Sequence, residues 1–450
     1  MTAPLLAVLM MVQLDSAPSP RSPRSPRSPR TVMAIGQVAL INTFVNRVDA
    51  LVFKHDWARS GTRVWGEHLR LGWEWDEDAF TTNMFAHPYH GSLYFNAARS
   101  NGVDFFQSVP YAIMGSWTWE YFGEKYRPSL NDWYMTSFGG ITLGEVFHRI
   151  SATIRDNRAT GRGRTLREIA ALPMDPIGSL NRLVRGEWRA RGVNPPEHDP
   201  GSYVFRIGGG ARFAKGLMAD SGVGRMGAML VDLLYGDPFA TEYRSPFDVF
   251  GVRLMLSSNG GFSSLRASGR IYGTNLNNPA RRARHVLAVN TRYDFFKNRA
   301  QSVGGQSVEI GINSRWPIGS RGYAFRTSIF GDGILLGAID ASGTGLGTRT
   351  YDFGPGVGAR WEFGFDRHGA RFLRVFGQLE YIHAVSGASA DHIVDFSGIE
   401  ANIPIGRGFG IAAHSTVFHR TSRYSTAPKD ERNYPEARLL LTWTKSGFKP

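Results

Sequence analysis

The residues best suited to chemistry in this chain of 450 residues lie in one segment, HPYHGSLYFNAARSNG, which covers residues 87–102. His87 and His90 are three residues apart, and Ser92 follows them closely. Two histidines on one side of a helical turn can bind a metal ion. A histidine beside a serine can instead activate the hydroxyl group for attack on a lipid ester, with an acidic residue orienting the imidazole.

The local sequence favours a structural role for this segment over either chemistry. Pro88 and Gly91 indicate a turn, and the chain has neither an H-E-x-x-H spacing nor a G-x-S-x-G elbow. We therefore expect the polar groups to bond the backbone of a buried turn, without a metal ion or a cofactor. The catalytic candidates are His87, His90, Ser92, Glu120 and Glu145, and the binding candidates are Tyr94, Asn96, Arg99, Asp132 and His148.

The composition limits both the chemistry and the partners. The chain has no cysteine, which excludes disulfides, thiol catalysis and cysteine-bound zinc. Its 52 Lys and Arg against 38 Asp and Glu give a net charge of +14, which predicts an anionic partner: nucleic acid, a phospholipid surface or lipopolysaccharide. The sequence lacks a run of about 20 apolar residues, which argues against a helical membrane protein but is compatible with a membrane β-barrel.

The N-terminal part of the chain is expected to be helical after a leader. Residues 1–30 predict a signal segment followed by a Ser-Pro-Arg repeat, whose prolines and arginines favour an extended linker. The repeat is either a polyanion-binding tail or, as we favour, a low-complexity leader. Residues 31–80 predict a lead-in helix and a strand-like segment, and residues 81–195 predict a helical region that carries the motifs.

Two stretches of this helical region should hold the candidate residues in place. Residues 105–119 are uncharged, and residues 140–155 have the apolar spacing of an amphipathic helix. Within the second stretch, Gly140 and Gly144 form a G-x-x-x-G pair, which permits close contact with another helix.

The C-terminal part, residues 200–450, alternates apolar and polar residues in about twelve segments of about ten residues or more. In residues 351–365, the apolar face carries Tyr351, Phe353, Val357, Trp361, Phe363 and Phe365. The polar faces are rich in Gly, Arg, Asn and Ser, which suits a crowded barrel interior better than the surface of a soluble sandwich. The pattern predicts a mainly β fold, a transmembrane antiparallel β-barrel of about twelve strands preceded by an α-helical insert or plug.

The interior of this predicted barrel is positively charged. Its lumen-facing residues include Arg206, Arg212, Arg266, Arg270, Arg284, Arg292, Arg315, Arg360, Arg374 and Arg438, with Asp294, Glu309, Asp352, Glu362, Glu380 and Glu436. We expect Glu120, Glu124, Asp132 and Glu145 to offset the excess, as a plug held by ion pairs in the lumen or at its periplasmic mouth. If the helical region lies outside the lumen, the arginines would line an anion-selective path.

Several motifs resemble one known family. WEWDEDAFTTNMFAHPYHGSLYFNAARSNG (73–102), SWTWEYFGE (116–124), PSLNDW (128–133) and GGITLGEVFHR (139–149) resemble a bacterial family known as domain of unknown function 3943 (DUF3943). The resemblance covers residues 33–190. It implies an outer-membrane envelope protein of Gram-negative-type bacteria, with no established activity. The positions shared with the family's motifs are His87, Tyr89, His90, Gly91, Tyr94, Asn96, Arg99, Glu120, Asn131, Asp132, Gly140, Gly144 and Glu145.

The sequence alone therefore leaves three classes of function open. The favoured one is a non-enzymatic outer-membrane barrel for transport, lipid handling or envelope structure. It would contact outer-membrane lipids and lipopolysaccharide and be inserted by the barrel-assembly machinery. The second is an outer-membrane enzyme acting on lipid or lipopolysaccharide through His87, His90 and Ser92. The third is a soluble polyanion-binding β protein. Nucleic acid is not expected as a partner, because the arginines alternate along strands and so point inward.

Overall fold

The computed structural model describes residues 29–195, 198, 201–214, 224–240, 242–258, 261–278, 280–298, 302–340, 350–367 and 369–447. The predicted signal segment, nearly all of the Ser-Pro-Arg repeat and the last three residues lie outside these ranges. The chain divides into two compact units. The first comprises Met1–Asp76 and Thr81–Pro200, and the second comprises Glu77–Phe80 and Gly201–Pro450.

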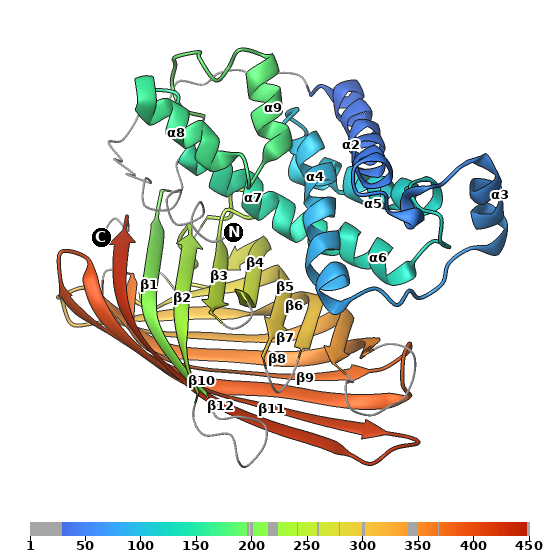
Figure 1. Cartoon of the computed structure of the whole chain (residues 1–450). Coiled ribbons are helices and arrows are strands. Elements are labelled where there is room, and N and C mark those ends of the chain that lie inside the picture. The colour runs from blue at the N-terminus through green and yellow to red at the C-terminus, as the bar shows by residue number, and fades with distance from the viewer. Residues whose placement is uncertain are drawn as a thin grey trace. The chain divides into compact units, whose positions relative to one another are not determined.

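The first unit is helical, and α4 lies at its centre (Figure 1). Its elements are α2 (Thr31–Leu51), η1 (Asp56–Ala58), α3 (Thr62–Leu71), η2 (Thr82–Ala86), α4 (His87–Arg99), α5 (Phe105–Phe122), α6 (Leu130–Tyr134), η3 (Met135–Gly139), α7 (Gly140–Ile154), α8 (Gly161–Ala171) and α9 (Pro176–Val184). Within the described part of the chain, no helix has both the length and the apolar character needed to cross a membrane.

Glycines bring α4 and α7 into backbone contact. A methyl group at Gly91 would lie 1.7 Å from the Thr136 carbonyl oxygen, and one at Gly140 would lie 2.6 Å from the Gly91 Cα atom. A methyl group at Gly144 would lie 2.9 Å from the Phe95 ring. Gly140 and Gly144 therefore permit the close helix contact that the sequence predicted, because any larger side chain would overlap the neighbouring helix.

The segment HPYHG is helical, so the prediction of a turn there is wrong. It forms the first turns of α4, which continues directly from the π-helical segment η2. Gly91 is used for contact with Gly140 rather than for a turn. Before residue 80 the structure has α3 and an isolated bridge between Glu74 and Ser129, where the sequence suggested a strand-like segment.

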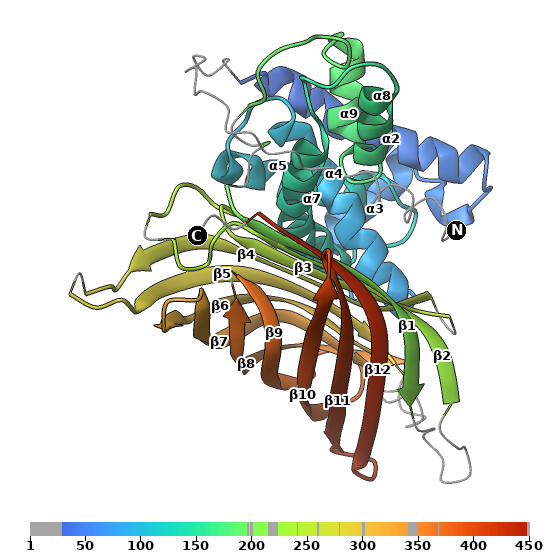
Figure 2. The same ribbon diagram turned by 90° about the vertical axis from the view of Figure 1, so that its left-hand side faces the viewer.

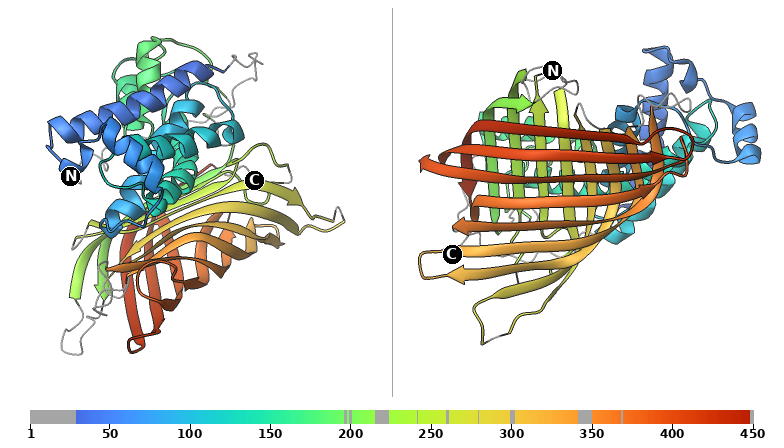
Figure 3. Two further views of the ribbon diagram at one scale, coloured as in Figure 1. Left: turned by 90° about the vertical axis from the view of Figure 1, so that its right-hand side faces the viewer. Right: turned by 90° about the horizontal axis from the view of Figure 1, so that it is seen from below.

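The second unit is a closed antiparallel barrel of twelve strands, as predicted (Figures 2 and 3). The strands are β1 (Tyr203–Ala214), β2 (Gly224–Tyr235), β3 (Phe250–Ser257), β4 (Gly261–Asn275), β5 (Arg284–Lys297), β6 (Ser302–Ile318), β7 (Tyr323–Asp340), β8 (Tyr351–Arg367), β9 (Ala370–His383), β10 (Ala390–Gly406), β11 (Phe409–Tyr424) and β12 (Asp430–Ser446). Each strand pairs with its sequence neighbours, and β1 closes the ring on β12 from Val204–Ser446 to Ala214–Glu436. The closed sheet has no free edge.

Side chains alternate between the lumen and the outer wall along most of each strand. In β8, Arg360 and Glu362 point inward, whereas Val357, Trp361 and Phe363 are exposed on the outside. This follows from the two-residue period of a strand, with β-bulges shifting the register locally in β4, β6, β7 and β8.

One part of the outer wall is covered by protein. Phe80, from the short segment assigned to the barrel unit, packs on Phe295 and Tyr351 with ring centroids 5.6 and 5.7 Å away. The Tyr351 hydroxyl donates a hydrogen bond to the Asp78 carbonyl oxygen. Tyr351 and Phe353 are therefore buried, although the sequence placed them on the exposed apolar face with Val357.

Candidate functional site

A histidine and two acidic residues converge inside the helical unit. His87 opens α4, Glu120 lies near the end of α5, and Asp132 lies in α6. All three are buried, and one nitrogen or oxygen atom of each lies within 4.8 Å of those of the other two. Both flanking π-helical segments, η2 and η3, border this cluster, and such segments often occur at functional sites.

The imidazole of His87 is held by both of its nitrogens. Nδ1 lies 3.1 Å from the Thr136 hydroxyl oxygen, and Nε2 lies 3.5 Å from Asp132 Oδ2. Burial lowers the pKa of His87 to about 4, against a smaller opposing effect of Asp76. The ring is therefore neutral at pH 7, with one nitrogen lone pair available to a ligand.

Asp132 lies among other acidic groups. Burial raises its pKa well above the usual value, and the nearby carboxyl groups of Asp76, Glu120 and Glu124 raise it further. Asn131 Nδ2 donates to both Asp76 Oδ1, at 2.6 Å, and Asp132 Oδ1, at 2.9 Å. Close carboxyl groups repel one another when ionised, so this arrangement favours a shared proton or a bound cation.

The serine and the second histidine do not form a nucleophile–base pair. The Ser92 hydroxyl donates to the Tyr89 carbonyl oxygen at 2.6 Å, within its own helix. His90 Nε2 lies 2.9 Å from the Tyr94 hydroxyl, and the His90 ring packs edge-on against Trp119. Ser92 is thus a satisfied buried hydroxyl, bonded within its own helix rather than to a histidine.

Glu145 has a different environment from Asp132, although both are buried in the same unit. Arg99 Nε lies 2.7 Å from Glu145 Oε2, and Arg149 Nε lies 2.8 Å from Oε1. Burial would raise the pKa of Glu145, but the charges of Arg99 and Arg149 outweigh it, and the pKa is lowered. Glu145 and Arg99 therefore form a buried ion-pair group that links α4 to α7 rather than part of the His87 cluster.

His148 belongs to a second histidine–carboxylate pair. Its Nδ1 lies 3.7 Å from Asp175 Oδ2, and Arg155 Nη1 lies 3.6 Å from the same oxygen. Asp175 also caps α9 by accepting the Gly178 N–H at 2.7 Å. Hydrogen bonds and positive charges outweigh burial here and lower the pKa of Asp175.

Two remaining candidates on α4 are buried with contrasting partners. Tyr94 donates its hydroxyl hydrogen to Asn42 Oδ1, and its ring lies against Gly115. Burial raises the pKa of Tyr94 well above its usual value. The Asn96 side-chain amide is fully buried and forms no hydrogen bond within the described part of the chain.

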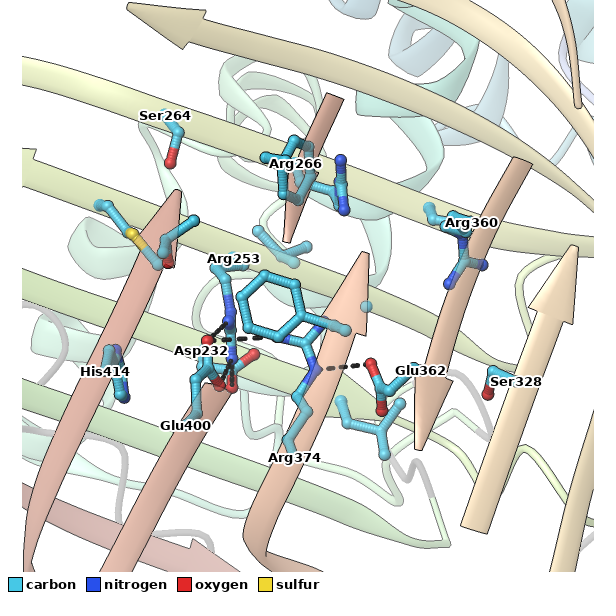
Figure 4. A pocket seen from close by; sticks show the side chains of 18 of the residues that line it. Asp232, Arg253, Ser264, Arg266, Ser328, Arg360, Glu362, Arg374, Glu400 and His414 are labelled. Atoms are coloured by element: carbon cyan, nitrogen blue, oxygen red, sulfur yellow. Dashed lines mark hydrogen bonds and ion pairs between the residues drawn. The ribbon is translucent and has the colours of Figure 1, made fainter. Parts of the chain in front are cut away.

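The barrel contains a cavity of ≈ 220 Å³ whose lining includes nine arginines (Figure 4). Arg253 lies between Asp232, at 2.9 Å, and Glu400, with which it forms a two-point ion pair. Arg374 bridges Glu400, at 3.2 Å, and Glu362, at 2.6 Å. The cavity wall is thus a chain of alternating charges contributed by strands far apart in the sequence.

A second group of charges is centred on Arg292. Its guanidinium is fully buried and reaches four carboxylates: Asp294 at 3.0 Å, Glu309 at 3.3 Å, Asp332 at 2.8 Å and Glu380 at 2.6 Å. Arg266 and Arg360 extend the group, because they pair with Asp294 and Glu309 at 2.6 and 2.7 Å.

Several of the residues predicted to face the lumen line cavities of the barrel. The main cavity is lined by Arg212, Arg266, Arg270, Arg360, Glu362 and Arg374, a smaller one is lined by Glu380, and Arg206 donates to the Arg371 carbonyl oxygen. The acids missed in the sequence are Asp232, Asp248, Asp332, Asp366 and Glu400, each within ion-pair distance of an interior arginine. Extending the alternation along β2, β7, β8 and β10 would have found Asp232, Asp332, Asp366 and Glu400, whereas Asp248 precedes β3.

These missed acids change the expected charge balance. Each interior carboxylate named above is supplied by the barrel itself. Glu120, Glu124, Asp132 and Glu145 instead have partners inside the helical unit: the Ser129 N–H, the Trp119 indole, His87, and Arg99 with Arg149. That these four acids hold a plug to the lumen by ion pairs stays a prediction.

The barrel is similar to solved structures of bacterial outer-membrane proteins. OpdQ of Pseudomonas aeruginosa is 10% identical, and the match covers 54% of this chain and 97% of that chain at a TM-score of 0.19. Omp33 of Acinetobacter baumannii is 10% identical, with 54% and 98% covered and a TM-score of 0.21. OccAB4 of the same organism is 8% identical, with 54% and 98% covered and a TM-score of 0.20.

The match to a known protein family lies in the helical unit and not in the barrel. No curated protein sequence matches the chain. A family model does match, over residues 72–177, which include His87, Glu120, Asp132 and Glu145. Its description is "Domain of unknown function (DUF3943)", and residues 72–177 of this chain are similar to that family.

Proposed function

We propose that this protein is a bacterial outer-membrane β-barrel with a closed lumen, which carries a helical DUF3943 domain and has no pore function of its own. It would contact outer-membrane lipids, including lipopolysaccharide, and require export and the barrel-assembly machinery for insertion. The observation that carries the proposal is the apolar outer wall of the closed barrel.

The outer wall has the character of a lipid-facing surface. Ile310, Val357 and Leu441 lie on three different strands, and each is exposed over more than half of its surface, at 59%, 62% and 57%. Exposing a leucine or isoleucine to water forgoes about 1.5–3 kcal/mol of burial energy per side chain. Soluble proteins rarely repeat such exposure along neighbouring strands, whereas lipid stabilises it.

The lumen has the character of a packed core rather than of a channel. Phe396 contacts Phe296, Phe376 and Phe418, with ring centroids 5.4 to 6.2 Å apart. Arg266 lies over the Phe296 ring at 5.3 Å, and Arg374 lies over the Phe376 ring at 4.2 Å. Aromatic rings and ion pairs therefore occupy much of the lumen around the ≈ 220 Å³ cavity that they line.

Fractionation of native cells tests the location. We expect the protein in the outer-membrane fraction, released only by detergent, with an electrophoretic mobility that changes on heating. Leu439→Arg, on the outer wall of β12, should lower barrel stability by about 2–4 kcal/mol in lipid. Leu276→Arg is the matched control, because Leu276 is exposed to a similar extent, 50% against 53% for Leu439, but lies just after the end of β4. Recovery of the native protein in the soluble cytosol would contradict the proposal.

Planar-bilayer recordings test the closed lumen. Pure, correctly inserted protein should carry no steady current. Large, steady, anion-selective currents would show instead that the interior arginines line a conducting path. Heat-modifiable migration in gel electrophoresis checks that the inserted protein is folded, so that an absence of current caused by misfolding is recognised.

A further inference from the structure

Sequence spacing paired His87 with His90, but the fold brings His87 to Asp132 and Glu120. The three residues come from α4, α5 and α6. Their potential ligand atoms lie within 4.8 Å of one another, and the side chains are buried. Ligand atoms bonded to one metal ion at about 2.0–2.2 Å lie up to about 4.4 Å apart, so a small closure suffices.

The orientation of His87 matches that of a metal-binding imidazole. Its Nδ1 faces the Thr136 hydroxyl at 3.1 Å, and its Nε2 faces Asp132 Oδ2. Histidines that bind metals commonly donate their other ring N–H to an oxygen, which fixes the tautomer and the ring plane. Thr136 can fill this supporting role, which leaves Nε2 directed into the acidic cluster.

The two carboxylates are oriented in the same way. Glu120 Oε2 accepts the Ser129 N–H at 2.9 Å, and Asp132 Oδ1 accepts Asn131 Nδ2 at 2.9 Å. Each carboxylate thus has one oxygen fixed by a neutral donor and a second oxygen that can serve as a ligand. Supporting hydrogen bonds of this kind are usual around bound metals.

The charge of the cluster also favours a cation. Among the described residues, Asp132 forms no ion pair with a lysine or an arginine. The neutral His87 ring lies 3.5 Å from it, and its carboxyl group is hydrogen bonded to that of Asp76. Asp175 provides the contrast, because it faces both His148 and the guanidinium of Arg155. A buried carboxylate group without an arginine or lysine partner is costly unless a cation or a proton balances it.

We propose that His87, Glu120 and Asp132 bind one divalent transition-metal ion, with Zn²⁺ as the ion that the ligands fit best. Imidazole nitrogen together with carboxylate oxygen suits Zn²⁺ and its neighbours, whereas Ca²⁺ and Mg²⁺ take oxygen ligands. The site lies wholly within the helical unit, so the inference is independent of the membrane location and of the closed lumen.

Metal titration of the full-length protein tests the site. Detergent-solubilised protein is freed of metal with a chelator and titrated with Zn²⁺, and bound metal is counted by mass spectrometry. We expect about one equivalent of tightly bound Zn²⁺, lost in His87→Ala and in Asp132→Asn. Thr136→Val should weaken binding by about 10–100-fold, the usual effect of removing a supporting hydrogen bond.

His148→Ala is the matched control, because it removes another buried histidine of the helical unit that faces a carboxylate. It should retain the full equivalent of Zn²⁺. Circular dichroism establishes that each variant is folded, and Asp132→Asn, which keeps the size of the side chain, guards against a folding failure in His87→Ala. Equal Zn²⁺ content in all folded variants would overturn the proposal, as would equally tight binding of Ca²⁺ or Mg²⁺. A wild-type protein without tight Zn²⁺ would show that a proton alone balances the carboxylates.

Discussion

Arg292 in the barrel and Asp132 in the helical unit are both buried charged groups, but their surroundings differ. Arg292 lies within 3.3 Å of four carboxylates, two of which also pair with further arginines. Asp132 has carboxyl groups and a neutral imidazole around it. Charges that are balanced by the chain itself hold a fold together, whereas charges that are left unbalanced are candidates for binding a ligand.

The same contrast exists within the helical unit alone. Glu145 is held between Arg99 and Arg149, and Asp175 faces Arg155 and His148. The helical unit thus contains enough arginine to neutralise buried acids where the fold requires it. The absence of an arginine or lysine ion pair to Asp132, among the described residues, therefore sets the His87 cluster apart from structural ion pairs.

Removal of Arg292 should have the largest effect. Arg292→Met leaves four carboxylates without their shared cation, which should destabilise the barrel by about 3–5 kcal/mol. Denaturant unfolding of the detergent-bound barrel, followed by heat-modifiable migration, measures the loss. Adding Asp332→Asn and Glu380→Gln to Arg292→Met should restore part of the stability. If the triple variant is no more stable than the single one, the carboxylates are not what Arg292 balances.

In the metal-free protein, Glu145→Gln and Asp132→Asn should have different effects on the free energy of unfolding. Glu145→Gln leaves Arg99 and Arg149 facing a neutral amide and should cost about 3 kcal/mol. Asp132→Asn relieves repulsion among carboxyl groups and should be neutral or stabilising by about 1 kcal/mol. Thermal unfolding monitored by helical circular dichroism compares the two. Equal destabilisation by both substitutions would remove the distinction between a balanced and an unbalanced site.

The next largest loss of stability is expected when the contact between α4 and α7 is disturbed. Gly91→Ala places a methyl group against the Thr136 carbonyl oxygen, so the helices must separate, at a cost of about 1–3 kcal/mol. Gly66→Ala is the control, because nothing lies within 4 Å of a methyl group there and α3 should gain about 0.5–1 kcal/mol. Because Thr136 also contacts His87, Gly91→Ala should weaken Zn²⁺ binding as well, and unchanged binding would show that the cluster tolerates the shift.

Low pH should lower the stability of the folded protein through the protonation of Glu145. The pKa of Glu145 is lower in the folded protein than its ordinary value of 4.5, although burial alone would raise it, because Arg99, Arg149 and His148 favour the carboxylate. Its contribution to stability is complete above pH 4.5 and is lost as the pH falls through the lowered pKa. Unfolding temperatures measured from pH 6 to pH 3 should fall less steeply in Glu145→Gln than in the wild type. Parallel curves would rule out Glu145 as a source of acid sensitivity.

The sequence alone determined the architecture of this protein. The two-residue period from residue 203 onward fixes which side chains point inward, and twelve such segments can avoid free edges by closing into a barrel. The spacing of Gly140 and Gly144 likewise anticipated the close helix contact. These features are local and periodic, so they are visible without knowing which distant residues meet.

Only the tertiary structure decided which charged groups meet. His87 lies 33 positions before Glu120 and 45 before Asp132 in the printed sequence, and spacing over such distances carries no signal. The same holds for Arg253 and Glu400, which become neighbours across the lumen because β3 and β10 face each other there. Local pattern thus specified the helices and the barrel, while long-range packing specified the cluster at His87 and the balance of charge inside the barrel.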